Sequence, residues 1–197
     1  KNNFSKKDFR IFRSRISSAY RYNFLENRQS LKEKIIFVKD LNDLKTSRIV
    51  SKNKIDWLMQ MGVNKIMKKA LLKAPKKGII NCHPGILPFF RGCCPVEWSV
   101  LLGQNIGVTT HIMGKDIDSG KIISTKKISY KKIRSYKNLR TKILNLQFSE
   151  ITKNVIKIDK NLLQLKNLKR IDKKKGFYFK PINNFLLQLV KKKLRYR

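Results

Sequence analysis

Acidic side chains are scarce in this chain. Only 12 Asp and Glu stand against 47 Lys and Arg among 197 residues, which gives a formal net charge of +35. Such an excess is typical of proteins that meet phosphates or an anionic surface. Long apolar runs are also lacking, since the best candidate, residues 185–190, is far shorter than the roughly 18 residues of a membrane span. No apolar segment follows the basic start, so the sequence predicts no signal peptide.

Cysteine and histidine are few, with three Cys and two His. An odd number of cysteines, of which Cys93 and Cys94 are adjacent, makes a poor disulfide framework. We therefore expect a reducing, cytoplasmic setting. The adjacency also does not fit the spacing of zinc ligands, so no metal site is expected. His111, in an apolar strand-like run, is expected to be a satisfied core or pocket-lining residue. A Walker phosphate loop and a dinucleotide glycine fingerprint are both missing from the sequence.

The positive charge is unevenly distributed. Residues 1–80 carry 21 basic and 6 acidic side chains, residues 126–197 carry 23 and 3, and residues 81–125 carry three of each. Two interpretations stay open for the basic flanks: a selected phosphate-binding surface, or Lys, Ile and Asn enrichment from an A- and T-rich genome. The 41% hydrophobic content argues against a disordered basic tail and predicts a folded core.

Strands and helices are expected to alternate along the chain. Hydrophobic periodicity, caps and breakers predict helices at 8–25, after Asn42, at 64–74, 95–103, 136–158 and 183–194, and strands at 34–38, 55–61, 78–80, 108–113, 122–129 and 176–179. This alternation predicts an α/β fold with a Rossmann-like, mostly parallel sheet and flanking helices.

The segment NCHPGILPFFRG, residues 81–92, has the strongest signature of a functional site. It follows a short strand, at the edge where open α/β sheets bind ligands. Asn81 and His83 are two apart, so they share one face of an extended segment. Asp118 lies on a later loop between strands that returns to the same region. An amide, an imidazole and a carboxylate together suit acyl or formyl transfer, although spacing alone leaves a structural role for the histidine open.

Three motifs in order, NCHPGILPFFRG, GVTTHIM and DIDSGKII, resemble the folate-dependent formyltransferase family, which includes methionyl-tRNA and sugar N-formyltransferases. The resemblance covers about residues 40–129. It implies the formyltransferase fold, although the first strand, glycine turn and helix of the family are not found before these motifs. It also implies 10-formyltetrahydrofolate as the formyl donor. Gly85 stands where many relatives have Ser.

By this resemblance, the family's catalytic residues fall on Asn81, His83 and Asp118. Asn81 would donate a hydrogen bond to the formyl oxygen, and His83, paired with Asp118, would stabilise its charge and help move protons. The folate pocket would be formed by two loop segments, which contribute Ile86, Leu87, Pro88, Lys115, Asp116 and Ile117.

The expected domain organisation is a catalytic domain over 1–160, incomplete at its N-terminus, followed by a basic extension over 161–197 that packs on it. The expected substrate is a small primary amine, such as a nucleotide-linked amino sugar. Alternatives are a methionyl-tRNA formyltransferase-like activity and hydrolysis of the formyl folate. A different class of function, a basic RNA-binding module on an inactive scaffold, also stays open. No membrane partner is expected, and the sequence does not indicate an oligomeric state.

Overall fold

A computed structural model describes residues 38–61 and 65–196. Its contacts divide the chain into two units, Lys1–Val38 and Lys39–Arg197, and every helix and strand that it describes belongs to the second. The helix predicted at 8–25 and the strand predicted at 34–38 lie outside the described residues, apart from Val38.

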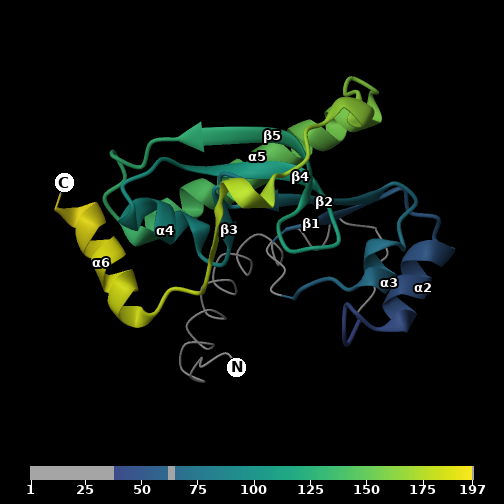
Figure 1. The fold of residues 1–197 in the computed structure, drawn as a ribbon, viewed down its shortest axis with the longest axis horizontal. Helices are drawn as coiled ribbons and strands as arrows, with labels where there is room; N and C mark the ends of the chain where they lie inside the picture. The colour runs from purple at the N-terminus through teal and green to yellow at the C-terminus, as the bar shows by residue number, and fades with distance from the viewer. Residues whose placement is uncertain (1–37, 62–64, 197) are drawn as a thin grey trace, which may run out of the picture. The chain divides into compact units, whose positions relative to one another are not determined.

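The described chain alternates between strands and helices (Figure 1). The strands are β1 (Trp57–Gln60), β2 (Gly78–His83), β3 (Phe90–Gly92), β4 (Ile106–Met113), β5 (Gly120–Ile128) and β6 (Phe177–Phe179). The helices are α2 (Leu44–Lys52), α3 (Lys69–Leu72), α4 (Pro95–Leu101), α5 (Tyr136–Asp159) and α6 (Asn184–Arg195), with short 3₁₀ turns at Leu165–Asn167 and Lys173–Lys175.

The main sheet has four strands in the order β1-β2-β4-β5. The α/β class with flanking helices is confirmed, but in the described residues the sheet is mixed rather than mostly parallel. Within this four-stranded sheet β1 and β2 run parallel, whereas β2–β4 and β4–β5 are antiparallel. The six residues between β4 and β5 are too few for a crossover, so these strands must be antiparallel.

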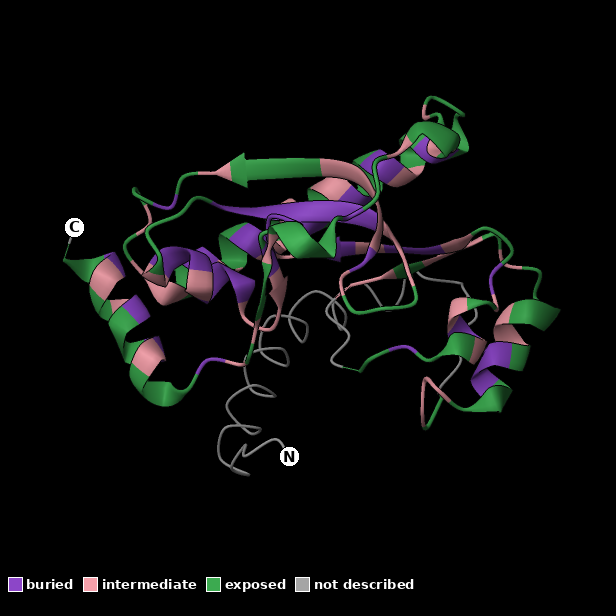
Figure 2. Ribbon diagram, in the orientation of Figure 1, coloured by how far each residue is buried: buried purple, intermediate pink, exposed green. Residues whose placement is uncertain are grey.

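Helix α5 covers one face of this sheet and anchors the core. The Ser135 side chain caps it by accepting a hydrogen bond from the Asn138 N–H at 3.1 Å. Its inward residues Leu139 and Ile143 are almost fully buried in one cluster with Ile80 and Val108 of the sheet. Figure 2 shows the consequence: β4 is buried, whereas the second half of β5 is exposed.

Two predicted helices differ from the observed ones at their ends. Helix α2 is capped by Asp43 rather than Asn42, because the Asp43 carboxylate accepts from the Lys45 N–H at 3.0 Å. The side chain of Asn42 instead bonds the backbone before α3, accepting from the Lys68 N–H at 2.8 Å. Helix α3 spans only Lys69–Leu72, within the predicted range of 64–74.

The C-terminal part of the chain is bound to the sheet and to the loops beside it. Residues 169–180, here called the C-terminal strap, first pair with β5, where the Ile171 N–H donates to Gly120 O at 2.8 Å. Strand β6 then pairs in parallel with β3, opposing Tyr178 to Arg91. Helix α6 follows and packs on α4, with Val190 buried in the main core. The boundary predicted at residue 160 stays a prediction, but the strap contacts loops that lie 80 residues earlier.

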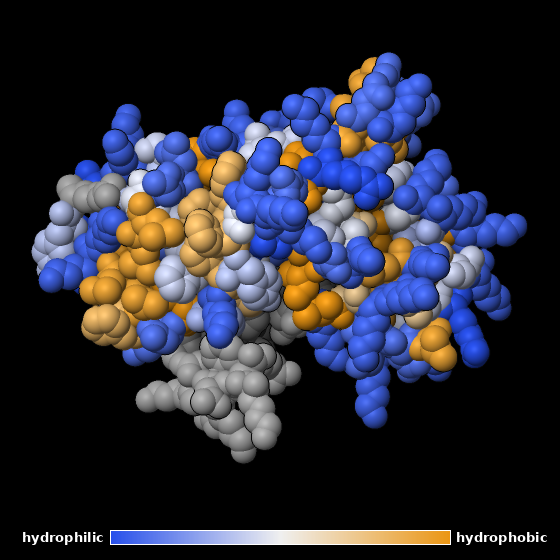
Figure 3. All heavy atoms as spheres, viewed as in Figure 1, coloured by the Kyte–Doolittle hydropathy of each residue, from blue (hydrophilic) through white to orange (hydrophobic). Residues whose placement is uncertain are grey.

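The surface of the viewed face is largely hydrophilic, as Figure 3 shows, with apolar side chains gathered over α6. Exposed apolar residues of that helix include Phe185 and Leu189. Among the helices that the structure describes, none is long and apolar enough to cross a membrane.

The strap lies so close to the loop after β2 that a side chain at Gly176 would not fit. A Cβ added there would stand 1.8 Å from the Pro88 carbonyl oxygen. We expect Gly176→Ala to lower the free energy of unfolding by about 1 to 3 kcal/mol, as overpacking typically does. It should also speed the amide exchange of Phe177 and Cys93, which donate across the β3–β6 contact.

Denaturant unfolding and hydrogen exchange measure both effects. Lys174→Ala is the matched control, because Lys174 lies on the same strap with its side chain exposed. Equal stability and equal exchange in the two variants would contradict the close packing.

Candidate active site

Asn81 and His83 occupy the second half of β2 and share one face of the strand. Cys82, between them, belongs to the buried core cluster on the other face. His83 is buried, with 4% of its surface exposed, while Asn81 is half-buried. The strand therefore places a reachable amide beside an enclosed imidazole.

Asp118 is brought to His83 by the loop between β4 and β5. The Asp118 Oδ1 lies 3.3 Å from His83 Nδ1, and its Oδ2 accepts from the Gly92 N–H at 2.6 Å. Asp118 has a positive φ of 47°, a conformation that Asp tolerates better than most residues. The structure thus brings together all three residues that the sequence predicted for catalysis.

Opposing effects act on the Asp118 carboxyl. Burial raises its pKa, but the charge and hydrogen bond of His83 and the Gly92 N–H outweigh burial and hold the pKa below 3.8. Asp118 is therefore ionised at neutral pH.

Both ring nitrogens of His83 face acceptors. Nδ1 faces the Asp118 carboxylate, and Nε2 lies 2.8 Å from the Phe90 carbonyl oxygen. Because both of these partners only accept, a ring protonated on both nitrogens satisfies both contacts. The Phe90 carbonyl therefore occupies Nε2 in this structure.

A second histidine, His111, lies next to Asn81. Asn81 opposes His111 in the ladder between β2 and β4, and its Nδ2 is 3.2 Å from His111 Nε2. The other ring nitrogen, Nδ1, is 3.1 Å from the Ser119 carbonyl oxygen. The sequence predicted a satisfied or pocket-lining histidine here but not this contact, because only the strand register reveals it.

The residues predicted to bind folate lie in two segments. In the first, Ile86 and Leu87 are buried and Pro88 is half-buried; the Leu87 N–H donates to Thr109 Oγ1 at 3.0 Å. In the second, Lys115, Asp116 and Ile117 are exposed. Their role in binding folate stays a prediction.

The strap contacts β3, which follows the first segment, and the second segment itself, and the sequence did not predict these contacts. Arg91 Nη2 donates to the Lys173 carbonyl at 3.0 Å, and Lys173 Nζ forms an ion pair with Asp116 at 2.6 Å. Half of the Tyr178 surface is exposed, and the pKa of this tyrosine, opposite Arg91, is raised by its partial burial and by the nearby Cys93 and Asp118. The strap therefore contributes a tyrosine to the neighbourhood of the Asp118 carboxylate, and only the strand-like run at 176–179 gave any sign of it.

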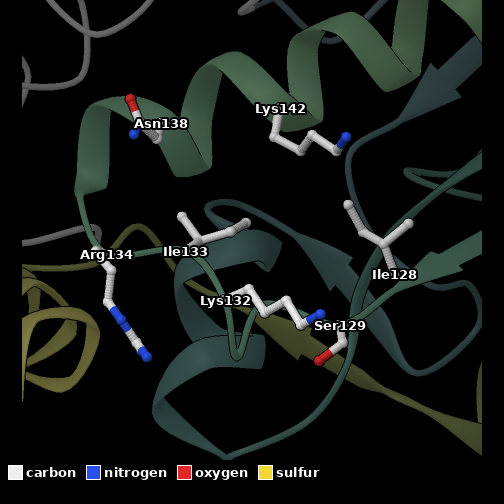
Figure 4. Close-up of a pocket in the computed structure, with 7 residues that line it drawn as sticks. All are labelled: Ile128, Ser129, Lys132, Ile133, Arg134, Asn138 and Lys142. Atoms are coloured by element: carbon white, nitrogen blue, oxygen red, sulfur yellow. The ribbon is translucent and has the colours of Figure 1, made fainter. Parts of the chain in front are cut away.

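A separate cavity of about 420 Å³ lies at the start of α5 (Figure 4). Its lining includes three cations and no acid, and consists of Ile128, Ser129, Lys132, Ile133, Arg134, Asn138 and Lys142. Among the described residues, no group of three or more His, Cys, Asp or Glu is arranged to hold a metal ion.

Comparison with known proteins identifies the family of this chain. The family model described as "Formyl transferase" matches residues 24–155. The chain is 36% identical over 137 residues to the bifunctional polymyxin resistance protein ArnA of Wigglesworthia glossinidia brevipalpis, covering 68% of this chain and 21% of that protein. It is 31% identical over 134 residues to methionyl-tRNA formyltransferase of Prochlorococcus marinus, covering 68% and 38%.

The chain therefore spans less than two fifths of the length of these two relatives. Solved structures share its fold. A likely sugar N-formyltransferase from Mycobacterium tuberculosis has a TM-score of 0.60 at 15% identity, covering 93% of this chain and 83% of that one.

The formyltransferase PseJ from Anoxybacillus kamchatkensis, solved with a formamido UDP-sugar and tetrahydrofolate, has a TM-score of 0.60 at 22% identity and covers 78% of each chain. These likenesses confirm the formyltransferase fold that the motifs predicted. Because the family model matches well over half of the sequence, this chain belongs to the formyl transferase family.

Proposed function

We propose that this chain transfers a formyl group from 10-formyltetrahydrofolate to a primary amine. The observation that carries the proposal is the ionised Asp118 paired with His83, beside the half-buried amide of Asn81 on the same strand face. Membership of the formyl transferase family supports it, and PseJ, which shares the fold, holds tetrahydrofolate.

Each residue has a distinct task in this reaction. Asn81 donates a hydrogen bond to the formyl oxygen as negative charge develops on it. His83, held by Asp118, places positive charge near the same oxygen. Asp118, through a water, accepts the proton that the amine loses as it bonds to the formyl carbon. The bond between formyl carbon and folate nitrogen breaks, and that nitrogen takes up a proton.

The formyl donor supplies an activated formyl carbon when it is bound. Two features of the chain suit it: the rigid loop with Ile86, Leu87 and Pro88 beside His83, and the exposed Lys115 on the Asp118 loop, whose cationic side chain complements a folate carboxylate. His83 reaches a substrate only after Nε2 leaves the Phe90 carbonyl. Such rearrangements are common when a site is filled, since catalytic hydrogen bonds often tighten only in the complex.

For the amine, we propose a small molecule such as a nucleotide-linked amino sugar. The likely sugar N-formyltransferase of known structure and PseJ, solved with a formamido UDP-sugar, support this class, while the methionyl-tRNA formyltransferase relatives support an aminoacyl-tRNA as the alternative. Hydrolysis of the formyl folate, with water in place of the amine, would use the same three residues.

Turnover tests the proposal directly. We expect the 197-residue chain to release tetrahydrofolate from 10-formyltetrahydrofolate when given one member of a panel of UDP- and dTDP-linked amino sugars and methionyl-tRNA. Asn81→Ala should lower kcat about 100- to 1,000-fold, because it removes one donor to the developing oxyanion. His83→Ala and Asp118→Asn should do at least as much.

Lys127→Ala, on the exposed half of β5, is the matched control and should leave the rate unchanged. Release of tetrahydrofolate without any amine would identify a hydrolase. If the folded chain neither binds nor consumes the formyl folate with any member of the panel, the proposal is wrong.

The ionised state of Asp118 has its own test. Because its pKa is lower in the folded than in the unfolded chain, its charge stabilises the fold at neutral pH, and this contribution is lost as the pH falls below 3.8. We expect Asp118→Asn to cost roughly 1 to 3 kcal/mol at pH 7, as removing a buried charged partner does. The difference from wild type should shrink at pH 3. Urea unfolding at both pH values measures it, and a difference independent of pH would contradict an ionised Asp118.

A second candidate function, RNA binding, is favoured by the basic cavity at the start of α5. Figure 4 shows Lys132, Arg134 and Lys142 around it, supplied by the segment before α5 and by α5 itself. If phosphates bind there, Lys132→Glu combined with Lys142→Glu should weaken RNA binding and flatten its salt dependence, since fewer counterions are released. His83→Ala should leave the affinity unchanged.

Filter binding or fluorescence anisotropy over 50 to 300 mM salt measures this. Equal affinity of wild type and the double variant would exclude the cavity as the RNA site. Lys126→Glu combined with Lys127→Glu, on the exposed end of β5, controls for net charge alone.

A further inference from the structure

The proposed mechanism leaves His111 without a task, although among the described residues it is the only side chain in hydrogen-bond contact with the Asn81 amide. His111 lies on β4, with 1% of its surface exposed. The ladder between β4 and β5 is irregular at Thr110 and His111. Such an irregularity is a common way of aiming a side chain beside a functional site.

The partners of the His111 ring determine its protonation. The Ser119 carbonyl, 3.1 Å from Nδ1, can only accept, so Nδ1 carries the hydrogen. Burial, followed by the charge on His83, lowers the pKa of His111 to about 4, which keeps the ring neutral at pH 7. A neutral ring with hydrogen on Nδ1 leaves a lone pair on Nε2. That lone pair faces the Asn81 Nδ2 at 3.2 Å.

The protonation of His111 in turn determines which way the Asn81 amide points. With Nδ2 toward the lone pair, one N–H of Asn81 donates to His111. Rotation of the amide by 180° would set its oxygen against the same lone pair, where two acceptors repel. Asn81 Nδ2 carries a second hydrogen, and this one is left for an acceptor in the site.

We propose that His111 is a positioning residue: through its contacts with the Ser119 carbonyl and the Asn81 amide, it holds Asn81 with one N–H directed to the formyl oxygen. This inference rests on the proposed function. Ser119 directly follows Asp118, so the same contact ties the orientation of the amide to the loop that carries the carboxylate. The hydrogen bonds from Asn81 through His111 to Ser119 then position both Asn81, which donates to the oxyanion, and Asp118, which accepts the proton.

Nitrogen NMR of the wild-type ring tests the orientation without any substrate. The chain has only two histidines, so His83→Ala assigns both sets of ring signals. We expect His111 to show a neutral ring with hydrogen on Nδ1 at pH 7, and to keep it down to pH 5.5. A charged ring, or hydrogen on Nε2, overturns the proposal, because either would require the opposite orientation of Asn81.

Kinetics test the consequence for catalysis. His111→Phe removes the acceptor and should lower kcat at least tenfold with an unchanged KM for 10-formyltetrahydrofolate. His111→Gln keeps an amide oxygen that can accept from Asn81 and should recover much of the loss. The amine is whichever member of the panel, UDP- or dTDP-linked amino sugar or methionyl-tRNA, the wild type formylates.

An unchanged kcat in a folded His111→Phe variant overturns the proposal, as does a His111→Gln variant no faster than His111→Phe. If His111→Phe does not fold, the proposal is still tested by the NMR result and by comparing kcat of the wild type with kcat of His111→Gln. Failure of the proposed function would give a different result. The wild type itself would then formylate none of the amines, whatever the state of the His111 ring.

Discussion

The contact between His83 and Asp118 is the constraint on which the site depends. It joins the end of β2 to the loop between β4 and β5, and it does so in a buried place where an unpaired carboxylate would be costly. The cost is offset by a second donor, the Gly92 N–H, which belongs to the short strand β3. The Asp118 carboxylate thus links the end of β2, the end of β3 and the loop between β4 and β5. Its ionised state is stabilised by these contacts of the folded chain.

The strap extends this arrangement to the C-terminal part of the chain. It contacts β3 through Arg91 and the loop that carries Asp118 through Asp116. Such contacts require backbones to approach closely, which glycine allows: at Gly92, a Cβ would lie 2.3 Å from the Phe179 carbonyl oxygen. The geometry of the site therefore depends on the packing of the strap, although the residues involved are about 80 positions apart in the sequence.

Local patterns predicted much of this structure. The long helix α5 shows a clear helical period and a capping serine, so its predicted span of 136–158 agrees with the observed Tyr136–Asp159 within one residue. The pairing of Asn81 with His83 on one face follows from the period of a strand. The directions of the strands were predicted less well, since they depend on how α4 and the loop before it return the chain to the sheet.

Contacts between segments far apart in the chain could not be predicted from the sequence. Strand β6 lies within the predicted strand at 176–179, but the three residues of β3 were not predicted, and no local pattern indicates that the two strands pair across more than 80 residues. The approach of His111 to Asn81 likewise depends on a register between two strands that no local pattern contains.

The contact between His83 and the Phe90 carbonyl has a consequence for recognition. Phe90 is the first residue of β3, and its ring stacks on Phe179 of the strap. A substrate that takes over His83 Nε2 must compete with a backbone oxygen that this stack holds in place. Under the proposed function, the Phe90 carbonyl thus occupies the ring nitrogen that a substrate would use. Under the proposed function, affinity for a substrate includes the work of breaking the contact between His83 and Phe90, and the stack of Phe90 on Phe179 adds to that work.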